Sequence, residues 1–316
     1  MDIASLKAFL AVAETGSFSA AAAQLFLTQP AVSKRVAALE RELKTPLFDR
    51  IGHRITLTEA GRALLLKARL ILNEIEESRR VVANLSGVIG GPLQLATSHH
   101  IGLHRLPPVL RDFSRRYPDV GLDIRFMESE AACTAVAAGE LELAVVTLPE
   151  SAASPLLLLP VWDDPMHIAA GAEHPLAKTQ LSGLAALAEY PAILPEADTF
   201  TRQIIEQKFR EQNLRLKIAL ETNYLETIRM MVAIGLGWSV LPETLFDGEL
   251  IRLDTAGFSL QRSLGVVRHR DKTLSNAGNA FIECALAFAA PQNHRLPRVD
   301  RPVRPGRPVR SSRRPG

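Results

Sequence analysis

The sequence predicts an α/β protein with an N-terminal winged helix-turn-helix, a long linker helix and a two-lobed α/β domain. Three observations lead to this fold class. Residues 1–57 contain three short helical patterns followed by two apolar runs around a glycine. A heptad-like pattern then continues to residue 85. A stretch rich in glycine separates it from strand and helix patterns that alternate up to residue 290.

The first two helices are marked by apolar spacing and by residues that begin or end a helix. Apolar residues recur at helical spacing from Leu6 to Ala13, and Gly16 ends that run. Ser17 is a suitable N-cap for a second short helix at 18–25, whose alanines allow another helix to approach closely. Residues 26–27 then form the tight turn of a helix-turn-helix.

The third helix, residues 28–43, is predicted to have one apolar face and one DNA-facing side. Val32, Val36, Leu39 and Leu43 have the spacing of the apolar face, and Thr28 is expected to cap the helix through its hydroxyl. Small, polar and basic residues at the start of the other side suit the major groove. The expected DNA contacts here are Ser19, Thr28, Gln29, Pro30, Ser33, Lys34 and Arg35.

The segment after the third helix predicts a basic β-hairpin, or wing. Two short apolar runs, 46–51 and 55–57, flank a tip of glycine, histidine and arginine. Arg50, His53 and Arg54 are therefore expected to contact phosphates or the minor groove beside the third helix. The alternative reading of residues 1–45, an ordinary helical bundle with a polar surface, does not explain this continuation.

Residues 59–85 predict a long linker helix that pairs with a second copy of the chain. Thr58 is its expected N-cap. The apolar positions fit a heptad in which polar Ser78 fills the remaining slot: Leu64, Ala68, Ile71, Ile75, Val82 and Leu85. A helix buried within one chain is the alternative, but charged residues cover the other faces.

Residues 1–85 resemble the DNA-binding half of LysR-type transcriptional regulators. The motifs that carry the resemblance are FSAAA (18–22), TQPAVS (28–33), LE (39–40), LFDR (47–50) and LTEAG (57–61). The resemblance implies a bacterial regulator that binds double-stranded promoter DNA as a homodimer or homotetramer, bends it, and meets RNA polymerase. It leaves open whether the protein is an activator, a repressor or both.

The second half begins after a predicted hinge at residues 86–92, where three glycines and a proline end the linker helix. Strand patterns at 93–97, 120–126 and 141–147 alternate with helix patterns at 106–117 and 131–138. The alternation of strand and helix patterns starts again near Trp162 and ends with a strand around 265–268 and a helix at 279–289. This alternation predicts a mostly parallel sheet with helices on both faces.

Residues 93–290 are similar to the effector domain of the same family, which is built like type 2 periplasmic binding proteins. The motifs are RYP (116–118), AGELELA (138–144) and GLGWSVLP (235–242). The resemblance implies lobe I at 93–161 and 266–290, lobe II at 162–265, and two crossing strands between them.

Ligands of such folds bind between the lobes, at strand C-termini and helix N-termini where free N–H groups favour an anion. The expected effector is therefore a small anionic metabolite. The residues expected to bind it are Thr97, Ser98, His99, His100, Ser129, Thr147, Thr199, Phe200, Thr201 and Gly237. Residues 96–100 with 106–107 are also similar to the family branch that controls sulfur assimilation, where this segment holds a small oxyanion.

Other functional classes are not favoured. His99, His100 and His104 suggest a metal, but no cysteine or carboxylate lies at a matching spacing, so neither a metal nor another cofactor is expected. An enzyme is not expected, because the sequence has no nucleophile elbow, P-loop or dinucleotide fingerprint. A redox-responsive regulator remains an alternative, although Cys133 and Cys284 lie in apolar helices and resemble core residues.

A solute-binding protein would explain the second half alone, without the DNA-binding half. A signal peptide and an apolar stretch of the roughly 20 residues that span a bilayer are both absent, so we expect a cytoplasmic protein without a membrane partner. The net charge is +3 for residues 1–85, −7 for 86–290 and +7 for 291–316. The last segment, with eight arginines and six prolines, is predicted to be disordered, either as a weak DNA-binding arm or as an extension without function.

Overall fold

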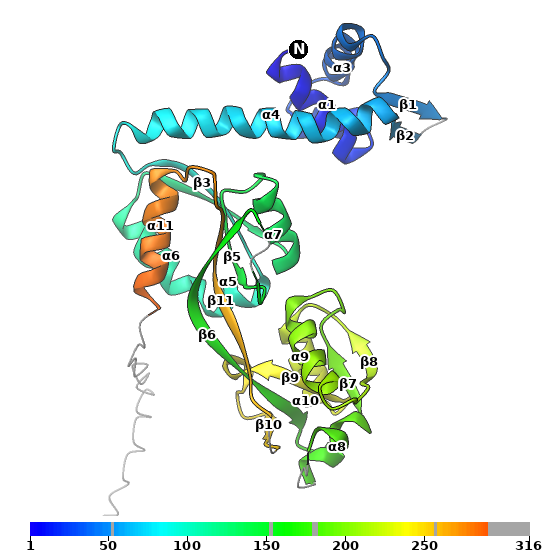
Figure 1. Ribbon diagram of the computed structural model, residues 1–316, viewed down its shortest axis with the longest axis vertical. Helices are drawn as coiled ribbons and strands as arrows, with labels where there is room; N and C mark the ends of the chain where they lie inside the picture. Colours follow the sequence, from blue (N-terminus) through cyan, green and yellow to red (C-terminus); the bar gives the residue numbers. More distant parts are fainter. Residues whose placement is uncertain (52–53, 152–153, 179–182, 256–257, 290–316) are drawn as a thin grey trace, which may run out of the picture.

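The computed structural model describes residues 1–51, 54–151, 154–178, 183–255 and 258–289. Its parts follow one another along a single long axis (Figure 1). The N-terminal helices lie at one end, the long helix α4 lies across the next part, and two α/β lobes complete the molecule. The predicted basic tail at 291–316 and the wing residue His53 lie outside the described residues.

Three short helices form the N-terminal core: α1 (Ile3–Thr15), α2 (Phe18–Gln24) and α3 (Gln29–Leu43). Gly16 ends α1 with a left-handed φ of 63°, and the Ser17 hydroxyl accepts a hydrogen bond from the Ala20 N–H at 3.3 Å. Both predicted helix ends are therefore confirmed. The aromatic rings of Phe9 and Phe18 pack on Phe48 of the wing, with ring centroids 5.4 and 5.9 Å away.

The start of α3 differs from its prediction. Thr28 is the N-cap, but its hydroxyl makes no capping hydrogen bond. Pro30, which lacks an N–H, occupies one of the first two helical positions, and the Ala31 N–H bonds instead to the Thr28 carbonyl at 3.0 Å. Leu43 is 39% exposed, so the buried face of α3 consists of Val32, Val36 and Leu39.

The wing is an antiparallel hairpin of β1 (Phe48–Ile51) and β2 (Arg54–Leu57), as predicted. The linker helix α4 (Glu59–Asn84) follows directly, and the Thr58 hydroxyl caps it by accepting from the Gly61 N–H at 2.9 Å. A Cβ on Gly61 would overlap the Leu47 carbonyl oxygen. The glycine therefore allows α4 to pack directly on the backbone before the wing.

Part of the predicted heptad of α4 is covered within the chain. Ala68 is fully buried in the N-terminal core, and Leu64 and Ile71 pack partly against it. The periodicity of a helix shows that one face is covered but does not show which partner covers it. The large apolar side chains that α4 leaves exposed are Leu66, Leu70, Val81, Val82 and Leu85.

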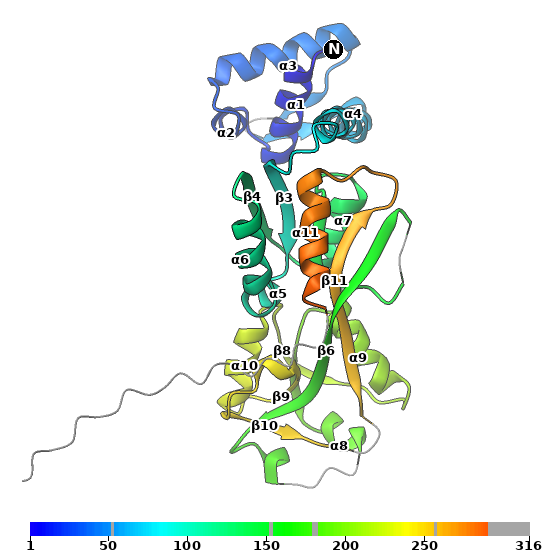
Figure 2. The same ribbon diagram turned by 90° about the vertical axis from the view of Figure 1, so that its left-hand side faces the viewer.

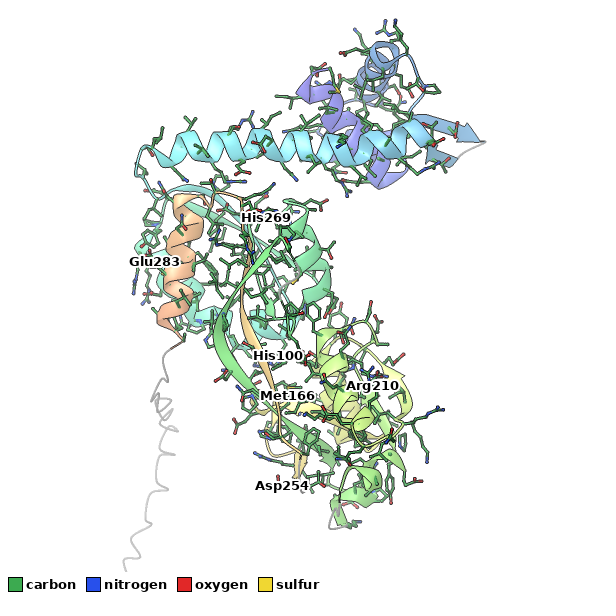
Figure 3. All side chains as sticks on the ribbon, in the orientation of Figure 1. His100, Met166, Arg210, Asp254, His269 and Glu283 are labelled. Carbon is green, nitrogen blue, oxygen red and sulfur yellow. The ribbon has the colours of Figure 1, made fainter. Side chains whose placement is uncertain are left out.

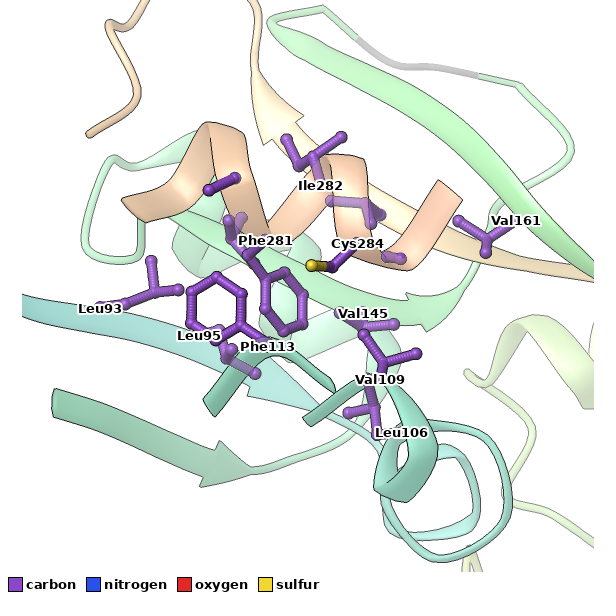
Figure 4. Close-up of a cluster of buried hydrophobic side chains, with 14 of the residues drawn as sticks. Leu93, Leu95, Leu106, Val109, Phe113, Val145, Val161, Phe281, Ile282 and Cys284 are labelled. Carbon is purple, nitrogen blue, oxygen red and sulfur yellow. The ribbon is translucent and has the colours of Figure 1, made fainter. Parts of the chain in front are cut away.

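Lobe I is a parallel sheet with helices on both faces. Its strands are β3 (Gly91–Thr97), β4 (Val120–Phe126) and β5 (Leu143–Thr147), and its helices are α5 (His99–His104), α6 (Leu106–Arg116), α7 (Ser129–Ala137) and α11 (Asn276–Ala287). One face buries Phe113 against Phe281, with Leu93, Leu95 and Cys284 in the same cluster (Figure 4). Helix α4 contacts this lobe through Asn73, which donates to the Ala138 carbonyl at 2.7 Å.

Lobe II repeats the alternation of strands and helices. Trp238, fully buried, stacks on Phe209 at a centroid distance of 5.6 Å and donates to the Tyr190 carbonyl. The elements are η1 (Pro175–Lys178), α8 (Leu184–Ala188), β7 (Pro191–Leu194), α9 (Phe200–Arg210), β8 (Lys217–Glu221), α10 (Leu225–Ala233), β9 (Trp238–Pro242), η2 (Glu243–Leu245) and β10 (Leu250–Leu253).

Two long strands, β6 (Leu156–Gly171) and β11 (Leu260–His269), run through both lobes (Figure 2). They join the lobes into one sheet of order β4-β3-β5-β11-β6-β9-β7-β8, with β10 paired to β6. Because β6 leaves lobe I and β11 returns to it, the two strands are antiparallel. The sheet is therefore parallel among β3, β4 and β5 and among β7, β8 and β9, but antiparallel at every pairing of β6 and β11, rather than mostly parallel as predicted.

Candidate DNA-binding surface and interlobe cleft

The exposed side of α3 carries most of the residues predicted to contact DNA. Gln29, Pro30 and Lys34 are exposed, while Ser33 and Arg35 are half-buried. The Gln29 side-chain amide donates to the Ser33 hydroxyl at 3.0 Å, which fixes these two polar groups one helical turn apart. Ser19 on α2 and the N-cap Thr28 are also exposed, whereas Arg50 and Arg54 belong to the wing strands. A basic and polar helix face beside a hairpin is suited to the major groove.

Sequence reasoning missed one exposed aromatic residue beside this surface. Phe26 lies in the turn between α2 and α3, is 96% exposed and has a φ of 55°. A left-handed backbone is unfavourable for a bulky residue, and here no burial of the ring offsets it. The sequence had indicated only that Phe26 belongs to the turn.

A cavity of about 40 Å³ lies between the two lobes, and His100, one of the residues that line it, is labelled in Figure 3. Seven of the ten residues predicted to bind an effector line it: Ser98, His99, His100, Ser129, Thr147, Thr199 and Thr201. They come together because the carboxyl ends of β3, β5 and β7 and the starts of α5, α7 and α9 face the same gap. Its remaining walls are Glu128, Glu130, Pro195, Asn223, Leu225 and Arg262.

The other three predicted residues do not line this cavity. Thr97 is fully buried, and its hydroxyl donates to the Val145 carbonyl at 2.8 Å, which ties β3 to β5. Phe200 lines a separate, larger hollow of about 900 Å³ that residues of α7 and α9 help to form. Gly237 packs against the Pro191 carbonyl oxygen, 2.6 Å from where a Cβ would lie.

The hydroxyl groups around the cavity differ in the hydrogen bonds that they already make within the chain. Thr199 caps α9 by accepting from the Arg202 N–H at 3.2 Å and donates to the Glu196 carbonyl. The Ser129 hydroxyl accepts from the Thr147 N–H at 3.2 Å. Ser98, by contrast, is the N-cap of α5 without a side-chain capping bond, so its hydroxyl is available to a ligand.

Arg262 is the functional candidate that the sequence did not indicate. This side chain on β11 is only 4% exposed, bonds Asp164 through Nε at 2.7 Å and donates through Nη1 to the Thr201 hydroxyl. Its Nη2 is buried without a hydrogen-bond partner among the described residues. A buried guanidinium nitrogen without an acceptor is costly, and Arg262 is also one of the residues that line the cavity.

Asp164 of β6 neutralises this part of the cleft. It is fully buried and also bonds Arg105 at 2.8 Å. Burial by itself would raise the pKa of Asp164, but the charge of Arg262 and the hydrogen bonds from Arg105 and Arg262 outweigh that effect and lower it. The carboxylate therefore stays charged at neutral pH between two arginines.

A carboxylate of lobe I occupies the N-terminus of α9 in lobe II. The Phe200 N–H donates to Glu130 Oε1 at 2.5 Å. Negative charge is favoured at a helix N-terminus, so Glu130 takes the place that the sequence had suggested for an effector anion. Burial and the charge of Glu130 raise the pKa of the neighbouring Glu128.

A histidine cluster joins the lobes on the other side of the cavity. Glu226 Oε1 of α10 lies 3.3 Å from His100 Nδ1 and 3.0 Å from His104 Nε2, both on α5. The hydrogen bond to His100 contributes most to lowering the pKa of Glu226 to about 2, whereas burial lowers the pKa of His100. His99 packs edge-on against Phe126 of lobe I and Tyr224 of lobe II.

The two cysteines are buried core residues, as predicted. Cys133 lies on α7 and Cys284 on α11, and neither forms a disulfide. Burial raises the pKa of Cys133 to about 11 and also raises that of Cys284. Because the thiolate is the reactive form of a cysteine, these shifts disfavour thiol chemistry at both positions.

Family models match both halves of the chain. A model described as "Bacterial regulatory helix-turn-helix protein, lysR family" matches residues 3–62, and one described as "LysR substrate binding domain" matches residues 86–290. The chain belongs to the LysR family of transcriptional regulators. As expected from the sequence, the proteins that it resembles are regulators of transcription rather than enzymes.

A sequence relative supports this family, and solved structures share the fold. The HTH-type transcriptional activator CmpR of Synechocystis is 32% identical over 88% of this chain and 93% of its own length. CbnR in complex with its target DNA has a TM-score of 0.64 at 22% identity, covering 92% of this chain and all of that one. The effector-binding domain of QuiR with shikimate has a TM-score of 0.58 at 20% identity, covering 63% of this chain and 97% of that one.

None of the described helices is long and apolar enough to cross a membrane.

Proposed function

We propose that this LysR-family regulator binds promoter DNA as a dimer, through α3 and the wing, and that a small anion bound between the lobes modulates this binding. The observation that carries the effector proposal is the buried, unpartnered Nη2 of Arg262, a residue that lines the same cleft as Ser98 with its available hydroxyl. In this proposal the effector-binding half senses the anion and the DNA-binding half responds to it within one chain.

The charges of the cleft also suggest the chemistry of the effector. Arg262 offers positive charge, whereas Glu128 and Glu130 offer acceptors in the same cavity. A ligand that carries a carboxylate together with hydroxyl or amino groups would satisfy both. Shikimate, held by the similar domain of QuiR, is a hydroxylated carboxylate, in agreement with this chemistry. Because the cavity measures only about 40 Å³, a ligand of that size requires the lobes to separate.

Two copies of the chain are proposed to meet along α4. The exposed side chains Leu66, Leu70 and Val81 project from a helix that otherwise carries many charges, and burial of such residues favours pairing. A symmetric dimer would place two α3 helices in successive major grooves about 34 Å apart. The same proposal extends to tetramers made of two dimers, to bending of the bound DNA and to contact with RNA polymerase. The effector can change DNA binding only if it binds one arrangement of the lobes or subunits more tightly than another.

Lys34→Ala is expected to weaken binding to the operator in the promoter of a neighbouring gene by roughly 5- to 150-fold. The lysine is exposed on α3, and each base or phosphate contact of this kind is worth about 1–3 kcal/mol. Fluorescence anisotropy at fixed salt measures the change. Lys178→Ala, on the exposed surface of lobe II, is the matched control and should leave affinity unchanged. If the unaltered protein, Lys34→Ala and Lys178→Ala all bind the operator equally tightly, Lys34 of α3 does not belong to the DNA interface.

Ser98→Ala is expected to weaken binding of the effector about tenfold, because a hydrogen bond to a charged group is lost. A thermal-shift screen of hydroxy acids, amino acids and inorganic anions on the full chain first identifies the ligand by the rise in its melting temperature. Ser114→Ala, an exposed serine of α6 that does not line the cleft, serves as the matched control. If the selected ligand binds Ser98→Ala as tightly as the unaltered protein, the cleft around Ser98 is not its site.

A further inference from the structure

We propose that His100, His104 and Glu226 form a binding site for a divalent transition-metal ion with the ligand preferences of zinc. The three side chains offer two imidazole nitrogens and a carboxylate oxygen, a ligand set that zinc accepts. Their donor atoms all lie within 4.8 Å of one another. This inference does not depend on the identity of the effector.

The distances fit a single ion. Donor atoms that bind one tetrahedral ion at about 2.0–2.1 Å lie about 3.4 Å apart. Glu226 Oε1 is 3.3 Å from His100 Nδ1 and 3.0 Å from His104 Nε2. The two histidines are four residues apart on α5, so they extend from the same side of the helix. Two of the three distances between donor atoms therefore match a single ion, and the third pair of donor atoms, on His100 and His104, lies within 4.8 Å.

The surroundings prepare His100 for this role. Its second nitrogen, Nε2, lies 3.2 Å from the Thr244 hydroxyl, which can accept a hydrogen bond from Nε2–H and so leave Nδ1 unprotonated to bind the ion. The nearby cations Arg105 and Arg262 both pair with Asp164, so part of their repulsion toward a dication is offset.

The site would link the two lobes. His100 and His104 belong to α5 of lobe I, whereas Glu226 belongs to α10 and Thr244 to η2, both in lobe II. An ion bound by both lobes favours the arrangement in which they lie close together. His104 and Glu226 are 30% and 33% exposed, so an ion can enter from solvent, and a fourth coordination position remains for water.

The test is isothermal titration of the tag-free full chain with Zn²⁺ after treatment with a chelator. We expect one ion to bind per chain through these residues. His104→Ala and Glu226→Gln should each weaken this binding at least tenfold, since each removes one of three protein ligands. Both side chains are partly exposed, so the variants should fold, which circular dichroism checks. Thr244→Val, which removes only the partner of Nε2, should weaken binding about tenfold.

His269→Ala is the matched control, because this histidine lies on β11 at the other end of lobe I, as Figure 3 shows. It should bind Zn²⁺ as tightly as the unaltered protein. A visible absorption spectrum of the Co²⁺ form typical of four-coordinate geometry would give independent support. Unchanged Zn²⁺ affinity in both His104→Ala and Glu226→Gln, or no binding at all to the unaltered chain, would overturn the proposal.

Discussion

Asp164→Asn is expected to lower the free energy of unfolding of the effector-binding half by roughly 3 kcal/mol. The Asp164 carboxylate is fully buried and bonds Arg262 at 2.7 Å and Arg105 at 2.8 Å. Asparagine keeps the shape but removes the charge, which leaves the buried guanidinium of Arg262 without a counterion. Removal of one partner of a buried ion pair costs far more than loss of an exposed one. Urea unfolding of the full chain at pH 7 measures the difference.

The neighbouring residue provides the control for this prediction. Asp163 precedes Asp164 on β6 but is exposed, so Asp163→Asn should change stability by less than about 0.5 kcal/mol. The lowered pKa of Asp164 means that its stabilising effect is complete above the unfolded pKa of about 3.9 and is lost as pH falls through the folded pKa. The decrease in stability caused by Asp164→Asn should therefore be the same at pH 7 and at pH 5. Equal stability of the two variants would show that the buried pair contributes nothing.

Gly265→Ala is expected to destabilise the effector-binding half by about 3 kcal/mol and to disturb the orientation of the lobes. Gly265 lies where β11 shifts its register on β6, between the two lobes. A Cβ there would overlap the Leu159 carbonyl oxygen and lie 2.9 Å from the Pro160 Cα. Both obstacles are backbone atoms of the crossing strand, so relief requires the two strands to move apart.

Gly121→Ala is the matched control, because Gly121 also lies in a strand, β4, but has nothing within 4 Å of its Cβ position. This change should leave stability equal or raise it by up to about 1 kcal/mol, since alanine reduces the entropy of the unfolded chain. Thermal unfolding of the two variants gives the comparison. A Gly265→Ala protein as stable as Gly121→Ala would mean that the crossing strands tolerate the extra methyl group.

Local sequence patterns predicted most helix starts, but they did not predict every capping bond or the packing partner of α4. Ser17 and Thr58 cap α2 and α4 as their sequences indicate, because capping needs only neighbouring residues. Thr28 is the N-cap of α3 as well, but its hydroxyl makes no capping hydrogen bond, and the Ala31 N–H bonds to the Thr28 carbonyl. The heptad of α4 was ambiguous, because Leu64 and Ala68 would show the same spacing whether their partner is this chain or a second copy.

The interlobe cleft was predictable where it depends on topology. Ser98, Ser129 and Thr199 line it because each opens or precedes a helix after a parallel strand, and that order is visible in the sequence. Arg262 was not predictable, because it lies within a strand, β11, and nothing in its neighbours in the sequence indicates burial or an unpartnered nitrogen. Glu130 likewise took the α9 N-terminus through a contact between lobes, 70 residues apart in the chain.

The sequence by itself determined the family, the DNA-binding half and the order of strands and helices, because these depend on motifs and on periodicities of neighbouring residues. The tertiary structure decided what meets across the lobes. His100 and His104 lack a carboxylate at any suitable spacing in the sequence, yet Glu226, 122 residues beyond His104, lies 3.0 Å from it. The sheet formed by β6 and β11 holds the two lobes together, and only their packing makes three distant side chains one potential metal site.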